Sequence, residues 1–144
     1  MFAISLILAS ALASGAASDG GSVRYVDSGK NGFPFSEAVH VGNTVYLSGQ
    51  LGVDPATGKL VEGGIEAESQ QTLRNVQAAL QRNGLDLRDA VKCTVFLADM
   101  ADWPAFNIIY RSYFPADRYP ARSAMGVNGL AMNARVEVEC IAAR

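Results

Sequence analysis

Two consecutive segments indicate how this chain folds: VKCTVFL at residues 91–97 and DWPAFNIIYRSY at residues 102–113. The first is rich in β-branched and aromatic residues, which favours a β-strand. The second opens with an aspartate and an early proline, as the first turn of a helix often does, and Pro115 ends it. Its aromatic and aliphatic side chains recur at helical spacing, so this face of the helix is expected to lie in the core.

A second helix is expected at residues 65–82, before that strand. Leu73, Val76 and Leu80 repeat on one face, and Asn83-Gly84 is typical of a helix C-terminus. The other face carries Glu, Gln and Arg side chains. This helix should therefore cover a sheet with one side and meet water with the other.

A β-hairpin is expected ahead of both helices. Residues 38–41 and 44–48 flank Gly42-Asn43, a two-residue connection of hairpin type, and a short strand is expected at residues 23–26. The order hairpin, helix, strand, helix and final strands predicts an α+β fold with two helices on one face of a mixed sheet. The opposite sheet face would be exposed unless copies of the chain associate through it, so self-association is expected.

Length and charge narrow the possible functions. The 144 residues are of single-domain size, and a hydrophobic content of 49% is enough for a core. The chain has 12 Lys and Arg against 14 Asp and Glu, a net charge of -2, and no basic cluster. Because phosphate binding needs concentrated Lys and Arg, nucleic acid is not expected as the main partner.

The N-terminus has the pattern of a signal peptide. Residues 2–13 form an apolar run of h-region length, and the small residues around Ala13 and Ala17 suit cleavage, although no Lys or Arg precedes the run. We expect residues 1–18 to be a cleaved signal peptide and residues 19–144 to be one domain. The mature protein would then be periplasmic or secreted and free of the membrane. The alternative is an apolar leader or a mis-assigned start on a cytoplasmic protein.

The cysteines and the single histidine do not indicate a metal site. Cys93 and Cys140 both lie in strand-like apolar runs and are expected to behave as small buried hydrophobic residues. An exported protein would permit a disulfide, but their spacing does not establish one. His40 lies on a hairpin arm, and the chain has no Cys-x-x-Cys pair, so no metal is expected.

The last quarter of the chain carries a candidate site. Arg122 follows Pro120 in an extended segment, and the strand-like run at residues 134–141 carries Glu137 and Glu139 in an apolar alternation. A guanidinium fork suits a small carboxylate, and a nearby glutamate can orient water or carry protons. Taken by themselves, these residues also fit a structural salt bridge between Arg122 and one of the two glutamates.

Several segments together resemble the RidA/YjgF/UK114 family of reactive-intermediate deaminases, from about Val23 to Arg144. They are SGQLG at 48–52, TLRNV at 72–76, VKCTVFL at 91–97, NIIY at 107–110, PARS at 120–123 and VEVE at 136–139. The resemblance implies a chorismate-mutase-like fold and a homotrimer whose sheets line a central barrel, with ligand clefts between neighbouring subunits. It also implies hydrolysis of 2-imino and 2-enamino acids to 2-oxo acids and ammonia, without a cofactor.

The same resemblance implies roles for individual residues. Arg122 would bind the substrate carboxylate bidentately, and Glu137 would orient or activate a water molecule and move protons. Asn107 would lie near the cleft, and backbone groups around Gly49 would help to hold the substrate. Glu139 would face the same side of its strand as Glu137 and is the alternative candidate.

Two positions depart from the family pattern. Many members have a cysteine where this chain has Ala124, and a tyrosine at the substrate-binding position of Phe35. Both changes remove polar atoms, so we expect an altered substrate preference or rate. A non-catalytic protein that binds small carboxylates and a holdase-like or RNA-cleaving role remain as alternatives. A chorismate-mutase reaction is disfavoured, because its dicarboxylate substrate needs more than the one cation, Arg122, that the sequence places.

Overall fold

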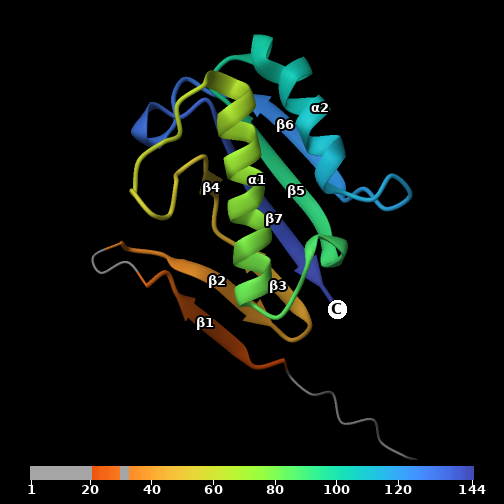
Figure 1. Ribbon diagram of the computed structural model, residues 1–144. Helices are drawn as coiled ribbons and strands as arrows, with labels where there is room; N and C mark the ends of the chain where they lie inside the picture. The colour runs from red at the N-terminus through yellow and green to blue at the C-terminus, as the bar shows by residue number, and fades with distance from the viewer. Residues whose placement is uncertain (1–20, 30–32) are drawn as a thin grey trace, which may run out of the picture.

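The structure is a computed structural model that describes residues 21–29 and 33–144 (Figure 1). The expected signal peptide, residues 1–18, lies outside the described residues. Within those two ranges, no helix has the length and apolar character needed to cross a membrane.

The described residues form seven strands and two α-helices in the order that the sequence predicts. The elements are β1 Val23–Asp27, β2 Ser36–Val41, β3 Thr44–Leu47, β4 Gln50–Leu51, α1 Gly64–Arg82, β5 Ala90–Leu97, α2 Trp103–Tyr113, β6 Ala121–Gly126 and β7 Val136–Ala143. The hairpin, both helices and the strand at 91–97 are confirmed to within a few residues at each end. The two-residue strand β4 is not indicated by any sequence pattern, because it is too short to show an alternation.

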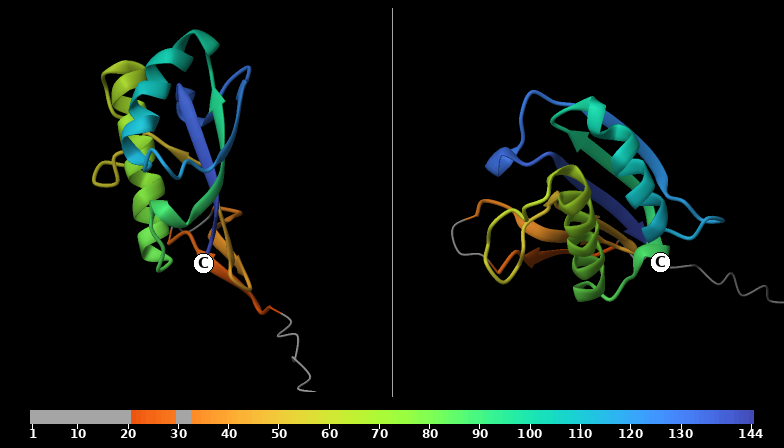
Figure 2. Two further views of the ribbon diagram at one scale, coloured as in Figure 1. Left: turned by 90° about the vertical axis from the view of Figure 1, so that its right-hand side faces the viewer. Right: turned by 45° about the horizontal axis from the view of Figure 1, so that its top comes forward.

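The strands form one mixed sheet with the order β1-β2-β3-β7-β5-β6, and β4 adds to β7 off this path. The β5–β6 pair is parallel and the other pairs are antiparallel. Figure 2 shows α1 and α2 on the same side of this sheet, which confirms the predicted α+β fold with two helices on one face. The α2 helix supplies the crossover that a parallel β5–β6 pair requires.

The core fills the space between the helices and the sheet. From α1 it takes the predicted stripe of Leu73, Val76 and Leu80, and from α2 it takes Phe106 and Tyr110, all of them buried. Alternate residues of β5 and β7 face this layer, since a strand presents every second side chain to the same side. The sheet contributions are Cys93, Val95, Leu97, Val136, Val138, Cys140 and Ala142.

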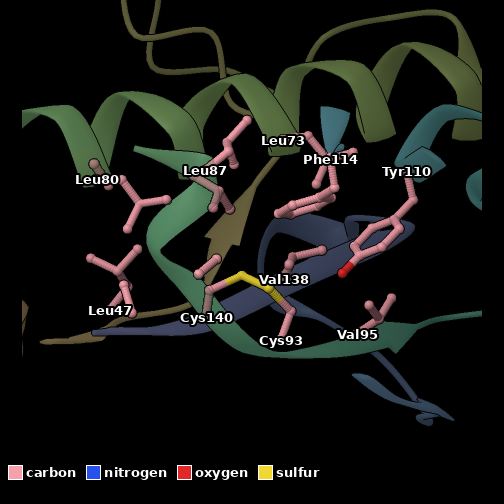
Figure 3. Close-up of a cluster of buried hydrophobic side chains, with 14 of the residues drawn as sticks. Leu47, Leu73, Leu80, Leu87, Cys93, Val95, Tyr110, Phe114, Val138 and Cys140 are labelled. Carbon is pink, nitrogen blue, oxygen red and sulfur yellow. A yellow bond between two sulfur atoms is a disulfide. The ribbon is translucent and has the colours of Figure 1, made fainter. Parts of the chain in front are cut away.

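Cys93 and Cys140 are joined by a disulfide in this layer (Figure 3). They lie directly opposite each other on β5 and β7, with Cα atoms 4.1 Å apart. The predicted burial of both cysteines is confirmed, and the disulfide, which the sequence left open, forms because the strand register brings them together across a sequence separation of 47. Closing a loop of this length removes unfolded-chain entropy equivalent to about 4 kcal/mol in the loop-closure model.

The sheet face without helices exposes several large apolar side chains. Tyr25 of β1, Tyr46 of β3 and Met125 of β6 all point to this side and are 72%, 47% and 44% exposed. Tyr46 lies directly opposite Ile141 of β7 in the register. Exposed apolar surface on a sheet face is typical of an interface, so the expectation of self-association stays as a prediction with a specific surface.

Candidate active site

Arg122 is held by two aromatic rings on the helix-bearing side of the sheet. It pairs with Cys93 in the β5–β6 register, so its side chain leaves the sheet toward α2. The guanidinium carbon lies 4.6 Å from the ring centroid of Trp103 and 4.5 Å from that of Tyr110. Both distances are those of cation–π contacts, which fix the plane of the guanidinium while leaving its N–H donors available.

The structure does not show the salt bridge that the sequence left open. The ion pairs among the described residues are Arg82–Glu37, Arg135–Asp102 and Arg144–Asp89. Arg122 takes part in none of them, so within residues 21–29 and 33–144 no carboxylate neutralises its charge. A rigid guanidinium without an acidic partner is suited to bind an external anion.

A hollow of about 300 Å³ opens beside this guanidinium. Asn107, which the resemblance placed near the cleft, lines the same hollow as Arg122. The full lining is Asn107, Tyr110, Arg111, Tyr119, Pro120 and Arg122. The lining therefore offers arginine, amide and phenol groups and no carboxylate, which is the composition of an anion-binding pocket.

Tyr110 contributes its aromatic ring to the support of Arg122, and its hydroxyl does not titrate in the physiological range. Burial raises its pKa to about 12, and the positive charge of Arg122 offsets only part of that increase. Its hydroxyl is buried without a hydrogen-bond partner among the described residues. The phenol therefore stays neutral across the physiological range, and its ring supports Arg122 from the core side.

Glu137 lies in a second cluster together with Gly49. A Cβ atom on Gly49 would collide with the Glu137 carboxyl group, whose Cδ would lie only 2.8 Å away. Position 49 therefore has to be glycine for the carboxylate to occupy this place. Leu51 of β4 pairs directly with Glu137, so the turn after β3 and the short strand β4 together set the surroundings of the carboxylate.

The electrostatics of Glu137 favour its protonated form. Burial is the larger cause of a raised pKa, and the negative charge of Glu139 adds to it. Glu139 is exposed two residues along β7 on the same face, as strand alternation predicts. A carboxyl group whose pKa is raised above its ordinary value of 4.5 exchanges protons more readily near neutral pH.

A single chain does not bring Arg122 and Glu137 together. Arg122 shares the face of Cys93, whereas Glu137 lies opposite Phe96, and Cys93 and Phe96 point to opposite sides of β5 because three positions separate them. Arg122 with Asn107 forms one half of the expected site, and Glu137 with Gly49 forms the other. The two halves lie on opposite faces of the sheet.

The two positions that depart from the family pattern are also visible. Ala124 follows Arg122 on the same face of β6 and packs partly buried against the core. Phe35 lies just before β2, is 51% exposed, and has its ring centroid 5.3 Å from that of Phe33. Ala124 thus places a methyl group beside Arg122, and Phe35 places an exposed ring at the end of the hairpin.

The sequence analysis missed the aromatic support of Arg122. The predicted core position is confirmed for Phe106 and Tyr110, but the sequence did not indicate that the rings of Tyr110 and Trp103 also contact Arg122. Arg111 was also missed, although Asn107 and Arg111 are four residues apart and thus share one helix face.

In the described parts of the chain, no group of three or more His, Cys, Asp or Glu side chains is placed to hold a metal ion.

Comparisons with known proteins give consistent matches. The family model described as Endoribonuclease L-PSP matches residues 30–144. A goat (Capra hircus) protein named 2-iminobutanoate/2-iminopropanoate deaminase is 48% identical over 109 residues, which are 76% of this chain and 79% of that protein.

Two solved structures show the same fold. A putative endoribonuclease from Thermotoga maritima has a TM-score of 0.78 at 41% identity, covering 84% of this chain and 97% of its own. TdcF from E. coli, solved with bound serine, has a TM-score of 0.73 at 33% identity, covering 78% of this chain and 89% of its own.

The charge coupling within the Glu137 cluster is testable. Replacing Glu139→Gln should lower the pKa of Glu137, because one of the two causes of its increase is removed, while burial keeps the pKa above 4.5. Titration of the Glu137 carboxyl carbon by NMR in both proteins measures this directly. An unchanged pKa would show that the two carboxylates do not interact.

The raised pKa of Glu137 also affects how the stability of the fold depends on pH. Because folding raises the pKa of Glu137, its contribution to stability is complete below the unfolded value and is lost as the pH rises through the folded value. Glu137→Gln should remove this part of the pH dependence of unfolding.

Proposed function

The chain belongs to the Endoribonuclease L-PSP family, which includes deaminases of the RidA type, and we propose on this basis that it hydrolyses 2-imino and 2-enamino acids to 2-oxo acids and ammonia. The observation that carries the proposal is the guanidinium of Arg122, fixed by two rings and left without an acidic partner among the described residues. The related TdcF binds serine, which has the same α-carboxylate as these substrates.

Arg122 positions the substrate. Its two N–H groups donate parallel hydrogen bonds to the carboxylate next to the imine carbon, and this holds the C=N bond in one orientation. Trp103 and Tyr110 keep the guanidinium in place, so little freedom has to be lost when the substrate binds. The amide of Asn107 is available in the same hollow for a further hydrogen bond.

Glu137 activates the attacking water and transfers protons. Water adds to the imine carbon, the nitrogen gains a proton, and the resulting 2-amino-2-hydroxy acid expels ammonia as its C–N bond breaks and the C=O bond forms. The Glu137 carboxylate accepts a proton from the attacking water and gives it to the imine nitrogen. It then carries the proton of the new hydroxyl group to the amino nitrogen, which leaves as ammonia. Its raised pKa suits both steps better than that of an ordinary carboxylate.

The catalytic unit is a homotrimer with clefts between neighbouring copies. One copy supplies Arg122 and Asn107, and its neighbour supplies Glu137 and Gly49. Two observations support this arrangement: the half-sites lie on opposite faces of the sheet in one chain, and the face without helices exposes Tyr25, Tyr46 and Met125. An assembly that covers this face buries the apolar surface and joins the half-sites together.

A non-catalytic role is the second candidate, because Ala124 has replaced a thiol beside Arg122 and Phe35 has replaced a phenol. A protein of this kind would bind small carboxylates through Arg122 without turnover, or would act as a holdase. Binding without acceleration of imine hydrolysis distinguishes it from the deaminase.

The protein is exported, with residues 1–18 as a cleaved signal peptide and residues 19–144 as the mature domain in the periplasm or outside the cell. The apolar run at residues 2–13 supports this proposal. The Cys93–Cys140 disulfide supports it independently, since such bonds persist mainly in oxidising compartments.

Imine hydrolysis tests the role of Arg122. The native protein should accelerate hydrolysis of 2-iminopropanoate generated in situ, and Arg122→Ala should lower kcat/KM by about 100-fold, the effect of losing two charge-assisted hydrogen bonds. Arg74→Gln removes a charge from the exposed side of α1 and serves as the control. No acceleration by the native protein, or full activity in Arg122→Ala, would exclude the deaminase.

Complementation tests the shared cleft. Arg122→Ala and Glu137→Gln should each be nearly inactive alone, but mixed trimers of the two variants should regain about a third of the native activity, because one of the three clefts in each mixed trimer has both native residues. The mixed assemblies are isolated with two different tags. If mixing restores nothing, the two residues do not act from neighbouring copies.

N-terminal sequencing tests export. Protein isolated from its native cell should begin after the small-residue run near residue 18 and not at Met1, and both cysteines should resist thiol labelling until a reductant is added. An intact Met1 on most of the protein would contradict export.

A further inference from the structure

The hollow beside Arg122 contains a second arginine. Arg111 lies in the last turn of α2 and follows Asn107 by four residues, so both side chains project from the same helix face. The same hollow of about 300 Å³ is lined by both arginines. Of these two arginines, only Arg122 has a role in the imine hydrolysis proposed for this site.

The charges around the hollow are unbalanced. Arg111 is exposed and, like Arg122, belongs to none of the three ion pairs of the described residues. The remaining lining residues, Asn107, Tyr110, Tyr119 and Pro120, bring no negative charge. Two guanidinium groups thus share a small hollow in a chain whose net charge is -2.

This arrangement favours a ligand with two negative charges. A monocarboxylate neutralises Arg122 and leaves Arg111 unpaired, whereas a dicarboxylate neutralises both. The rings of Tyr110 and Tyr119 with Pro120 supply apolar wall for the short carbon chain between two carboxylates. Ala124 on the Arg122 face adds no polar group that such a chain would have to desolvate.

We propose that Arg111 determines substrate specificity by binding a second carboxylate, so that the preferred substrates are 2-imino acids whose side chain ends in a carboxylate, such as 2-iminosuccinate and 2-iminoglutarate. The proposal rests on the deaminase function and extends it. Arg122 binds the carboxylate beside the imine carbon, and Arg111 binds the distal one. The reaction is unchanged: one water is consumed, the C=N bond is replaced by C=O, and ammonia leaves.

An isosteric pair of substrates isolates the contribution of the distal charge. 2-Iminosuccinate and its distal amide, generated in situ from aspartate and asparagine by an amino-acid oxidase, differ in charge but hardly in shape. The native protein should prefer the dicarboxylate in kcat/KM, and Arg111→Gln should lower the ratio of the two kcat/KM values about fivefold, the upper range for an exposed ion pair.

Matched variants separate charge recognition from a general structural effect. Arg111→Lys retains the charge and should restore most of the ratio, whereas Arg74→Gln removes a charge from α1 and should leave the ratio unchanged. The preference should also weaken as salt is added, because an exposed pair is screened. An equal loss for both substrates in Arg111→Gln, or no change in the ratio, would overturn the proposal.

A binding measurement keeps this inference separate from the deaminase function. Isothermal titration with 2-oxoglutarate and with 2-oxobutanoate needs no turnover, and 2-oxoglutarate should bind more tightly in a manner that depends on Arg111. Equal affinities would reject the role of Arg111 even if 2-iminopropanoate is hydrolysed. Tighter binding of 2-oxoglutarate without hydrolysis of any imine would reject the deaminase and retain the dicarboxylate site.

Discussion

The pairing of β5 with β7 is the constraint on which the rest of the structure depends. Cys93 lies directly opposite Cys140, and the disulfide between them fixes which residues of both strands face the helices. A shift of β7 by one residue would turn Val136 and Val138 out of the core and bring Glu137 into it. On its other edge, β5 pairs with β6, and Cys93 is also the residue opposite Arg122. Core and site therefore depend on one set of strand contacts.

Within one chain, the sheet keeps the opposite charges of Arg122 and Glu137 apart. If Arg122 and Glu137 lay on one face of the same chain, they would neutralise each other, and a substrate carboxylate would have to displace the glutamate. The sheet prevents this by placing them on opposite sides. Arg122 takes its support from the rings of Trp103 and Tyr110. These rings orient the guanidinium without reducing its charge, and this preserves its affinity for an anion.

The α2 helix packs into the core with one side and lines the hollow with another. Phe106 belongs only to the core, and Tyr110 belongs to the core while its ring also touches Arg122. Asn107 and Arg111 project into the hollow. Because packing fixes the helix through its aromatic side, the polar side is held rigidly, and differences in ligand preference can arise from exposed positions such as Arg111 without disturbing the core.

The sequence by itself determined the order of elements, the α+β class, the apolar faces of both helices, and Arg122 as a carboxylate-binding candidate. These features are local: a helix repeats every 3.6 residues and a strand every two, so neighbouring residues reveal them. Only the tertiary structure decided that Cys93 meets Cys140, that Arg122 and Glu137 lie on opposite faces, and that Arg111 joins Arg122 in one hollow. Each of these depends on how segments distant in the chain pair and pack, and no local pattern records that register.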